Sequence, residues 1–274
     1  MTATTAPVQE VSRHELTRAP FVDLVKAELG KILSQRPQRW LFGIAVLLAP
    51  MAAIVFCISL PVTQGKTLGD TATGDVLTAS LLGIDAATIA AIVFAAVAVG
   101  TEYSTGLMQH SITVTPNRTR LLTAKTIAVA SATAVIGVAG VILVGAVAGA
   151  AVAGTGRSFV DILGGSGPRL LAGSILMPVF YGVLATLFAF MFRKTAAGIL
   201  GPIAVLVLAA IIGWFGADIS QVLTPLTPLA GLHSISGIAS GAEDIGPLSG
   251  AITLIVWLLF GYGIARWRFT RKDA

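Results

Sequence analysis

Residues 101–126, TEYSTGLMQHSITVTPNRTRLLTAKT, form a polar interruption between two long apolar runs of the chain. Pro116 cannot continue a helix, but a proline fits the first position of one. The stretch therefore predicts a short helix that ends before Pro116 and a second helix that follows it, with Thr115 as the N-cap. Apolar runs on both sides of this loop predict two consecutive membrane-spanning helices.

The short helix before the proline has an apolar side. Leu107 lies four residues before Ser111, so the two share one side of a helical turn. Met108 and Ile112 are related in the same way. Two interpretations stay open. A short helix with an apolar side, held between two membrane spans, suits docking onto a soluble partner. Alternatively, residues 101–122 are an ordinary basic loop that only sets the orientation of the protein.

The composition of the whole chain is that of a membrane protein. Of its 274 residues, 55% are hydrophobic and only 11% are charged, and the mean hydropathy is +0.88. These values lie far outside the range of soluble globular proteins. The single cysteine, Cys57, lies within an apolar run, so the sequence holds no disulfide framework. We expect an all-α fold that crosses the membrane several times.

Six apolar runs have about the length, ~20 residues or more, that an α-helix needs to cross the hydrocarbon of a bilayer. None of them carries a charged residue at its centre, where such a residue costs about 3 kcal/mol. We therefore expect a six-helix transmembrane domain within residues 40–274. The runs lie at about residues 40–60, 81–100, 123–154, 168–192, 196–216 and 247–266.

The first 39 residues are polar enough to stay outside the bilayer. Residues 1–17 show no periodicity, which favours disorder. Residues 20–36 are bounded by prolines, and their apolar residues recur with the period of a helix. We expect an amphipathic helix that lies along the cytoplasmic surface of the membrane. Its apolar side consists of Phe21, Val22, Val25, Leu29, Ile32 and Leu33.

Glu28 is the exception in this helix, because its angle places a carboxylate within the apolar side. A carboxylate in such a place needs a charged or hydrogen-bonding partner. Lys31, one turn further on, or a base from residues 101–126 can supply that partner. The alternative is that Glu28 lies at the edge of the apolar side and reaches water.

The basic residues are distributed unevenly between the two sides of the predicted membrane. Fifteen of the eighteen Lys and Arg residues fall in the N-terminal segment, in the loops after the second and fourth spans, and at the C-terminal end. Only Lys66, Arg157 and Arg169 fall in the other loops. Since basic loops stay in the cytoplasm, we expect both termini to be cytoplasmic. The asymmetry also accounts for the pI of 9.7, so no nucleic-acid partner is expected.

The last loop on the opposite side, residues 217–246, is too short and apolar to form a separate domain. It contains two Thr-Pro steps and many small residues. Irregular backbone is tolerated at membrane depth only where protein or water covers it. We expect a re-entrant pair of short helices or a cap over a pathway, with a plain surface loop as the alternative.

Several kinds of chemistry are excluded by what the chain lacks. Three His and one Cys cannot form a metal cluster, and no phosphate-loop or nucleophile motif has its required spacing. Ion-coupled carriers place carboxylates near the midplane of the membrane, whereas the ionisable residues of these runs lie near their ends. The sequence therefore favours a pathway for an apolar or amphipathic compound, driven from elsewhere, over an ion-coupled secondary transporter or channel.

Three segments together resemble one known family. Residues 100–125, GTEYSTGLMQHSITVTPNRTRLLTAK, are similar to the signature of the type-2 ATP-binding-cassette (ABC) permeases, in which E-Y-x-x-G is followed by P-x-R-x-R and a final K. Residues 24–31, LVKAELGK, resemble the E-x-x-K entry helix of that family, and residues 271–274, RKDA, resemble its closing R-R-D-A. The chain departs from the pattern at Gln109, where many relatives carry a base.

The resemblance implies the membrane subunit of an exporter in the bacterial cell membrane. In this family two permease subunits pair, here expected as a homodimer, and two separate ABC ATPase subunits bind ATP and Mg and drive them. This chain is then expected to bind no cofactor and to be no enzyme. The loop between the second and third spans forms the coupling helix, which contacts the ATPase together with the entry helix. Those contacts fall to Glu102, Tyr103, Gly106, Leu107, Met108, Pro116, Arg118 and Arg120, with Glu28 and Lys31 from the entry helix.

Overall fold

The computed structural model describes residues 20–271 except Lys66. All regular structure in this part of the chain is helical, and none of it is β-strand. Six helical segments are long and apolar enough to cross a membrane, and each of the six predicted runs overlaps one of them. The chain is therefore an all-α, multi-pass membrane protein. The segments are α3 (Arg36–Gln64), α4 (Thr73–Ser104), α6 (Arg118–Ala153), α7 with α8 (Gly167–Ser174 and Leu176–Phe192), α9 (Thr195–Gly213) and α12 (Pro247–Arg271).

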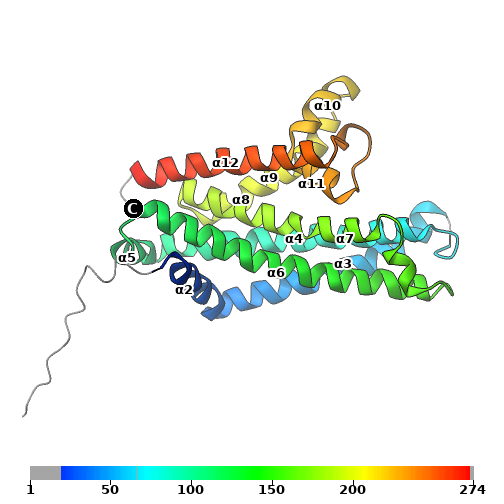
Figure 1. Cartoon of the computed structure of the whole chain (residues 1–274), viewed down its shortest axis with the longest axis horizontal. Coiled ribbons are helices and arrows are strands. Elements are labelled where there is room, and N and C mark those ends of the chain that lie inside the picture. The colour runs from blue at the N-terminus through cyan, green and yellow to red at the C-terminus, as the bar shows by residue number, and fades with distance from the viewer. Residues whose placement is uncertain (1–19, 66, 272–274) are drawn as a thin grey trace, which may run out of the picture.

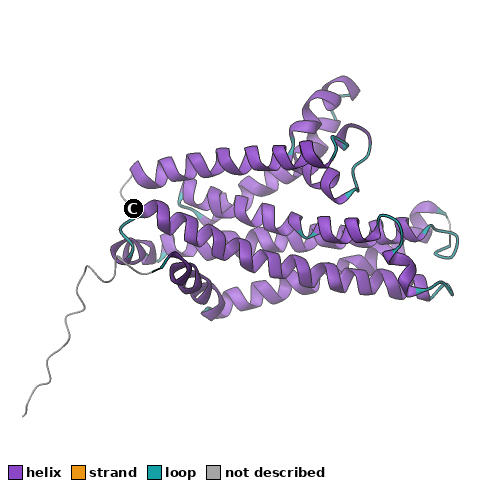
Figure 2. Ribbon diagram, viewed as in Figure 1, coloured by secondary structure: helices purple, strands orange, loops and turns teal. Residues whose placement is uncertain are grey.

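The six segments run back and forth along one bundle (Figure 1). Short helices lie at both of its ends, joined to the long ones by loops (Figure 2). The α5 end carries α2 (Phe21–Ser34), α5 (Leu107–Val114) and the end of α12, and the α11 end carries α10 (Ala217–Leu223) and α11 (Pro228–Ser236). The predicted disorder of residues 1–17 and the last three residues of the RKDA motif lie outside the described residues.

Helix α4 lies at the centre of the bundle, and it packs against α3, α6, α8 and α9. Small residues allow these close approaches. A Cβ atom at Gly83 would lie 2.2 Å from the backbone oxygen of Ala49 on α3, and one at Gly100 would lie 2.6 Å from the Cα of Thr195 on α9. By contrast α3, α9 and α12 leave most of their apolar side chains outside the bundle, where lipid is the solvent that suits them.

The predicted fourth span is two helices rather than one. Helix α7 ends at Ser174 and α8 begins at Leu176. Pro178 accounts for the break, because its ring nitrogen has no hydrogen to donate to the carbonyl of Ser174, four residues earlier. The break lies beside α6, where a Cβ atom at Gly137 would come within 2.9 Å of the carbonyl oxygen of Ile175.

The prediction of Thr115 as the N-cap of the third span is wrong. Thr115 is the C-cap of α5, and α6 begins at Arg118 with Asn117 as its N-cap. The side-chain oxygen of Asn117 accepts a hydrogen bond of 3.0 Å from the backbone N–H of Arg120. Asparagine is among the best residues for this role, so the helix begins two residues later than a proline at its first position requires.

Residues 217–246 contain two short α-helices, so the alternative of a plain surface loop is wrong. Helix α11 packs against α7 and α12, and a Cβ atom at Gly173 would lie 2.3 Å from the Cα of Ser236. Arg169 of α7 donates hydrogen bonds to the carbonyl oxygens of Ser234 (2.7 Å) and Ile235 (3.1 Å) near the end of α11. A cation at a helix C-terminus also meets the negative end of the helix dipole. These contacts hold α11 against the bundle.

Candidate functional site

The ten residues that the sequence predicts for the site lie at the α5 end of the bundle. Four elements supply them: α2, the end of α4, α5, and the link from α5 to the start of α6. Gly106 makes the turn between α4 and α5 with φ of 75°, a left-handed conformation that glycine adopts without strain. The chain thus reverses sharply after α4, and α5 lies across the end of the bundle beside α2 (Figure 1).

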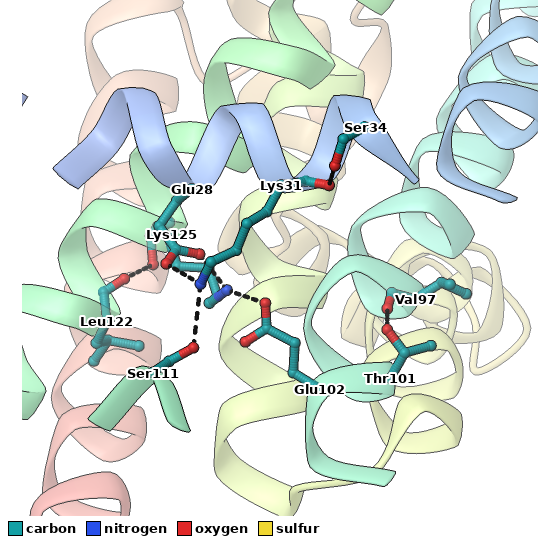
Figure 3. Close-up of polar contacts among 10 residues, drawn as sticks. Glu28, Lys31, Ser34, Val97, Thr101, Glu102, Ser111, Leu122 and Lys125 are labelled. Carbon is teal, nitrogen blue, oxygen red and sulfur yellow. Dashed lines mark hydrogen bonds and ion pairs between the residues drawn. The ribbon is translucent and has the colours of Figure 1, made fainter. Parts of the chain in front are cut away.

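Two of the predicted residues, Glu28 and Glu102, have buried side chains that both contact one lysine. Lys125 of α6 lies between two carboxylates and donates hydrogen bonds to Glu28 of α2 and to Glu102 of α4, the latter over 2.6 Å (Figure 3). Lys31 donates to the other oxygen of Glu28 over 2.6 Å and to the hydroxyl of Ser111 on α5 over 3.1 Å. We call these five residues the ion cluster. It joins α2, α4, α5 and α6.

Burial makes the ion cluster energetically important. Glu28, Glu102 and Lys125 are each at most 4% exposed, so removal of one partner leaves a largely desolvated charge unpaired. Two lysines balance two carboxylates, and the cluster is neutral as a whole. Burial alone would raise the pKa of Glu28, but the charges and hydrogen bonds of Lys125 and Lys31 outweigh it and hold that pKa below its ordinary value of 4.5.

The pairing of Glu28 with Lys31 and with a base from residues 101–126 is confirmed, and the alternative that it reaches water is wrong. Lys125 and Ser111 were not among the predicted site residues. Lys125 closes the resemblance motif, and it is a lone base near the start of an apolar run. That position could have identified Lys125 from the sequence, since a base that enters the bundle with its helix needs an acidic partner.

Aromatic and apolar packing fixes the other side of α5. Met108 is 1% exposed and belongs to an apolar cluster with residues of α4, α6, α8 and α12. Tyr103 meets the ring of Phe190 edge to face, with centroids 6.0 Å apart. Arg118 donates a hydrogen bond of 3.0 Å to the carbonyl oxygen of Phe269 and so joins the start of α6 to the end of α12. Tyr103, Met108 and Arg118 therefore contact α8 and α12 in addition to α4 and α6.

The outer side of α5 is open. Leu107 is 51% exposed and Val114 is 54% exposed, and Pro116 is also exposed. A cavity of about 390 Å³ lies between α2 and α5, with Leu107, His110 and Val114 on one wall and Leu24, Ala27 and Lys31 on the other. The apolar side predicted for this helix is thus divided: Met108 packs into the bundle, while Leu107 and Ser111 line this cavity.

No protein-family model matches the chain, and no curated protein matches its sequence. Within residues 20–271, Lys66 aside, no group of three or more His, Cys, Asp or Glu side chains could hold a metal ion.

Proposed function

We propose that this chain is the membrane subunit of an ATP-driven exporter of the type-2 ABC class, in the cell membrane of a bacterium. The observation that carries the proposal is the ion cluster, which joins the short helix α5 to α2, α4 and α6. Helix α5 lies across the end of the bundle and is bonded to three other elements. A displacement of α5 by a soluble partner can therefore be transmitted to the membrane-spanning helices.

In this proposal α5 is the coupling helix and α2 is the entry helix. Leu107 and Val114, both half-exposed beside the cavity, offer an apolar contact to the partner. The partner would be a pair of ABC ATPase subunits that bind ATP and Mg²⁺, and this chain would contribute no catalytic residue. Closure of the ATPase pair would move α5, and the ion cluster would carry α2 and the ends of α4 and α6 with it. Two packings of the bundle would then exchange by such small movements.

The pairing of Glu102 would change between the two states of this mechanism. Its Oε1 accepts from Lys125, whereas its Oε2 is buried without a hydrogen-bond partner among the described residues. A buried carboxylate oxygen without a donor is costly, so an arrangement that brings a donor to Oε2 is favoured. The two states of the exporter would differ in how Glu102 is paired.

The spans α3, α9 and α12 present large apolar surfaces to their surroundings. In the proposed assembly part of this surface would contact a second permease subunit, expected to be another copy of this chain, and the rest would contact lipid. The compound that is moved would be apolar or amphipathic, because the bundle carries its charged residues near the ends of its spans.

Co-purification with the ABC ATPase encoded beside the gene of this chain tests the proposal. We expect the ATPase to remain bound in detergent, and Leu107→Glu with Val114→Glu to release it. Val222→Glu on α10 is the matched control, because Val222 is an exposed apolar residue at the other end of the bundle. Failure of the wild-type chain to hold the ATPase would contradict the proposal. Transport by the chain alone, driven by a proton or sodium gradient, would favour an ion-coupled carrier or channel.

Coupling is tested separately from docking. We expect Glu102→Gln combined with Arg118→Ala to abolish the stimulation of ATPase activity by the permease while the protein still inserts and holds its partner. Unchanged stimulation would remove both residues from the coupling role.

A further inference from the structure

A second polar site lies at the α11 end, far from the ion cluster. A cavity of about 70 Å³ lies between α4, α7, α8 and α11, and Asp85 of α4 and His233 of α11 both line it. Most of the other lining residues are apolar, and none is a lysine or arginine. A carboxylate within a membrane-spanning helix marks a functional site by default, because its burial is costly unless it has a role or a partner.

The carboxylate of Asp85 is unpaired within the part of the chain that the structure describes. Among the described residues none gives its carboxylate a hydrogen bond or an ion pair, and His233 acts on it only electrostatically. Arg169, the basic residue of α7, is engaged with the carbonyl oxygens of Ser234 and Ile235 on α11. The charge of Asp85 therefore remains available to a ligand in the cavity.

The ring of His233, which lines the same cavity, is held by Glu243. Its Nδ1 lies 2.8 Å from Oε2 of Glu243. A carboxylate can only accept a hydrogen bond, so Nδ1 carries a proton and donates it to Glu243. Glu243 thus orients the ring of His233.

The three hydroxyl groups that line the cavity are acceptors as well, because each has donated its hydrogen to a backbone carbonyl. Ser174 donates to Leu170 over 2.7 Å, Ser236 donates to His233 over 3.1 Å, and Thr78 donates to Gly74 over 2.8 Å. The three hydroxyls and Asp85 therefore offer the cavity lone pairs and one carboxylate, and none of these four groups has a free donor.

We propose that this cavity binds the ammonium group of a cationic amphiphile. An ammonium ion has several donors and no acceptor, which is the complement of this wall. The volume suits such a head group with one or two carbons, and the apolar residues around it suit an attached hydrocarbon chain. Binding of an amine in this cavity does not depend on the proposed exporter. If the chain is that exporter, the compounds that it exports are amines with an apolar body.

Binding of decylammonium to the purified chain in lipid nanodiscs, without any ATPase, tests this inference. Empty nanodiscs give the background due to lipid. We expect Asp85→Asn to weaken binding at least about tenfold, the effect of losing one charged hydrogen bond. Asp75→Asn, an exposed position on the same helix, should leave the affinity unchanged. Equal affinity of wild type and Asp85→Asn would overturn the inference.

Comparison of ligands on the wild-type chain needs no variant and stays valid even if Asp85→Asn fails to fold. Decyltrimethylammonium has the charge but no N–H donor, and decanoate has the opposite charge. We expect both to bind at least about tenfold more weakly than decylammonium. Equal binding of the trimethyl compound, or displacement of decylammonium by millimolar sodium, would overturn the inference. Because no ATPase is present, amine binding through Asp85 would stand even if the ATPase never co-purified.

Discussion

Replacement of Lys125 by Met leaves two carboxylates, Glu28 and Glu102, buried without the ammonium that they share. Removal of one partner from a buried ion pair typically costs about 3–5 kcal/mol of folding free energy. We expect a loss of this size for Lys125→Met when unfolding is measured in detergent micelles. Lys26→Met is the control: its side chain is 74% exposed, so its effect should stay within about 0.5 kcal/mol. Similar losses for the two variants would contradict the assigned role of Lys125.

The pH dependence of stability should report on Glu28. Its pKa in the folded protein lies below the ordinary value of 4.5, so the unfolded chain takes up a proton first as the pH falls. The stabilisation is complete above about pH 4.5 and is lost as the pH falls through the folded-state pKa. We expect the free energy of unfolding to fall more steeply in this window for the wild type than for Glu28→Gln. The exposed Asp23→Asn should keep the wild-type slope, and a Glu28→Gln curve parallel to the wild type would refute the assignment.

Burial of the Gln38 side chain destabilises the fold, because its amide has no hydrogen-bond partner among the described residues. It is 1% exposed, and neither atom of its amide has a hydrogen-bond partner there. An unsatisfied buried polar group costs about 1–3 kcal/mol, so we expect Gln38→Met to stabilise the protein by about 1 kcal/mol. Gln221→Met, at an exposed position on α10, should have little effect. A destabilised Gln38→Met would show that the amide has a partner, such as a bound water.

The residues of the site were only partly predictable. The period of α2 identifies Glu28 as a carboxylate on an apolar side, and hence as one that needs a base. Which distant base reaches it depends on how α2 packs against α6, and Lys125 lies 97 residues away. The spacing of residues along the chain does not show how α2 packs against α6.

At the scale of elements, the close approach of α3 and α4 gives a sharp test. A Cβ atom at Gly83 would lie 2.2 Å from the carbonyl oxygen of Ala49, which cannot move without its helix. We expect Gly83→Ala to destabilise the bundle by about 1–3 kcal/mol, the usual cost of overpacking. Gly43→Ala is the matched control on α3, because nothing lies within 4 Å of its added methyl group. Thermal unfolding compares the two, and equal unfolding temperatures would contradict the packing.

The long elements were predictable and their interruptions were less so. Six apolar runs predict six spans, because an apolar segment that crosses hydrocarbon must pair all its backbone polar groups and does so as a helix. Such segments are recognised from their length and composition alone. The break before Pro178 and the start of α6 at Arg118 depend on which single backbone groups lose or gain a partner. The packing of α11 against α7 depends on small residues meeting across distant segments, such as Gly173 and Ser236.

At the scale of the whole molecule, Arg157 and Arg169, two of the three bases in the base-poor loops, make structural contacts at the α11 end. Arg157 donates hydrogen bonds of 2.8 Å to the carbonyl oxygens of Leu68 and Thr71, so it joins the loop before α4 to the loop after α6. Arg169 holds the end of α11. These two exceptions to the charge asymmetry are therefore explained by local contacts, which leaves the asymmetry itself as a signal for orientation.

Cysteine labelling in intact bacteria tests that orientation. Cys57 is buried, and its replacement by Ala gives an unreactive background. His110→Cys on α5 and Ser240→Cys after α11 then place one exposed thiol at each end of the bundle. Since basic segments stay in the cytoplasm, we expect a membrane-impermeant maleimide to label position 240 in intact cells and position 110 only after the cells are opened. Labelling of position 110 in intact cells would place α5 outside, where no ATPase can reach it, and the proposed exporter would fall with it.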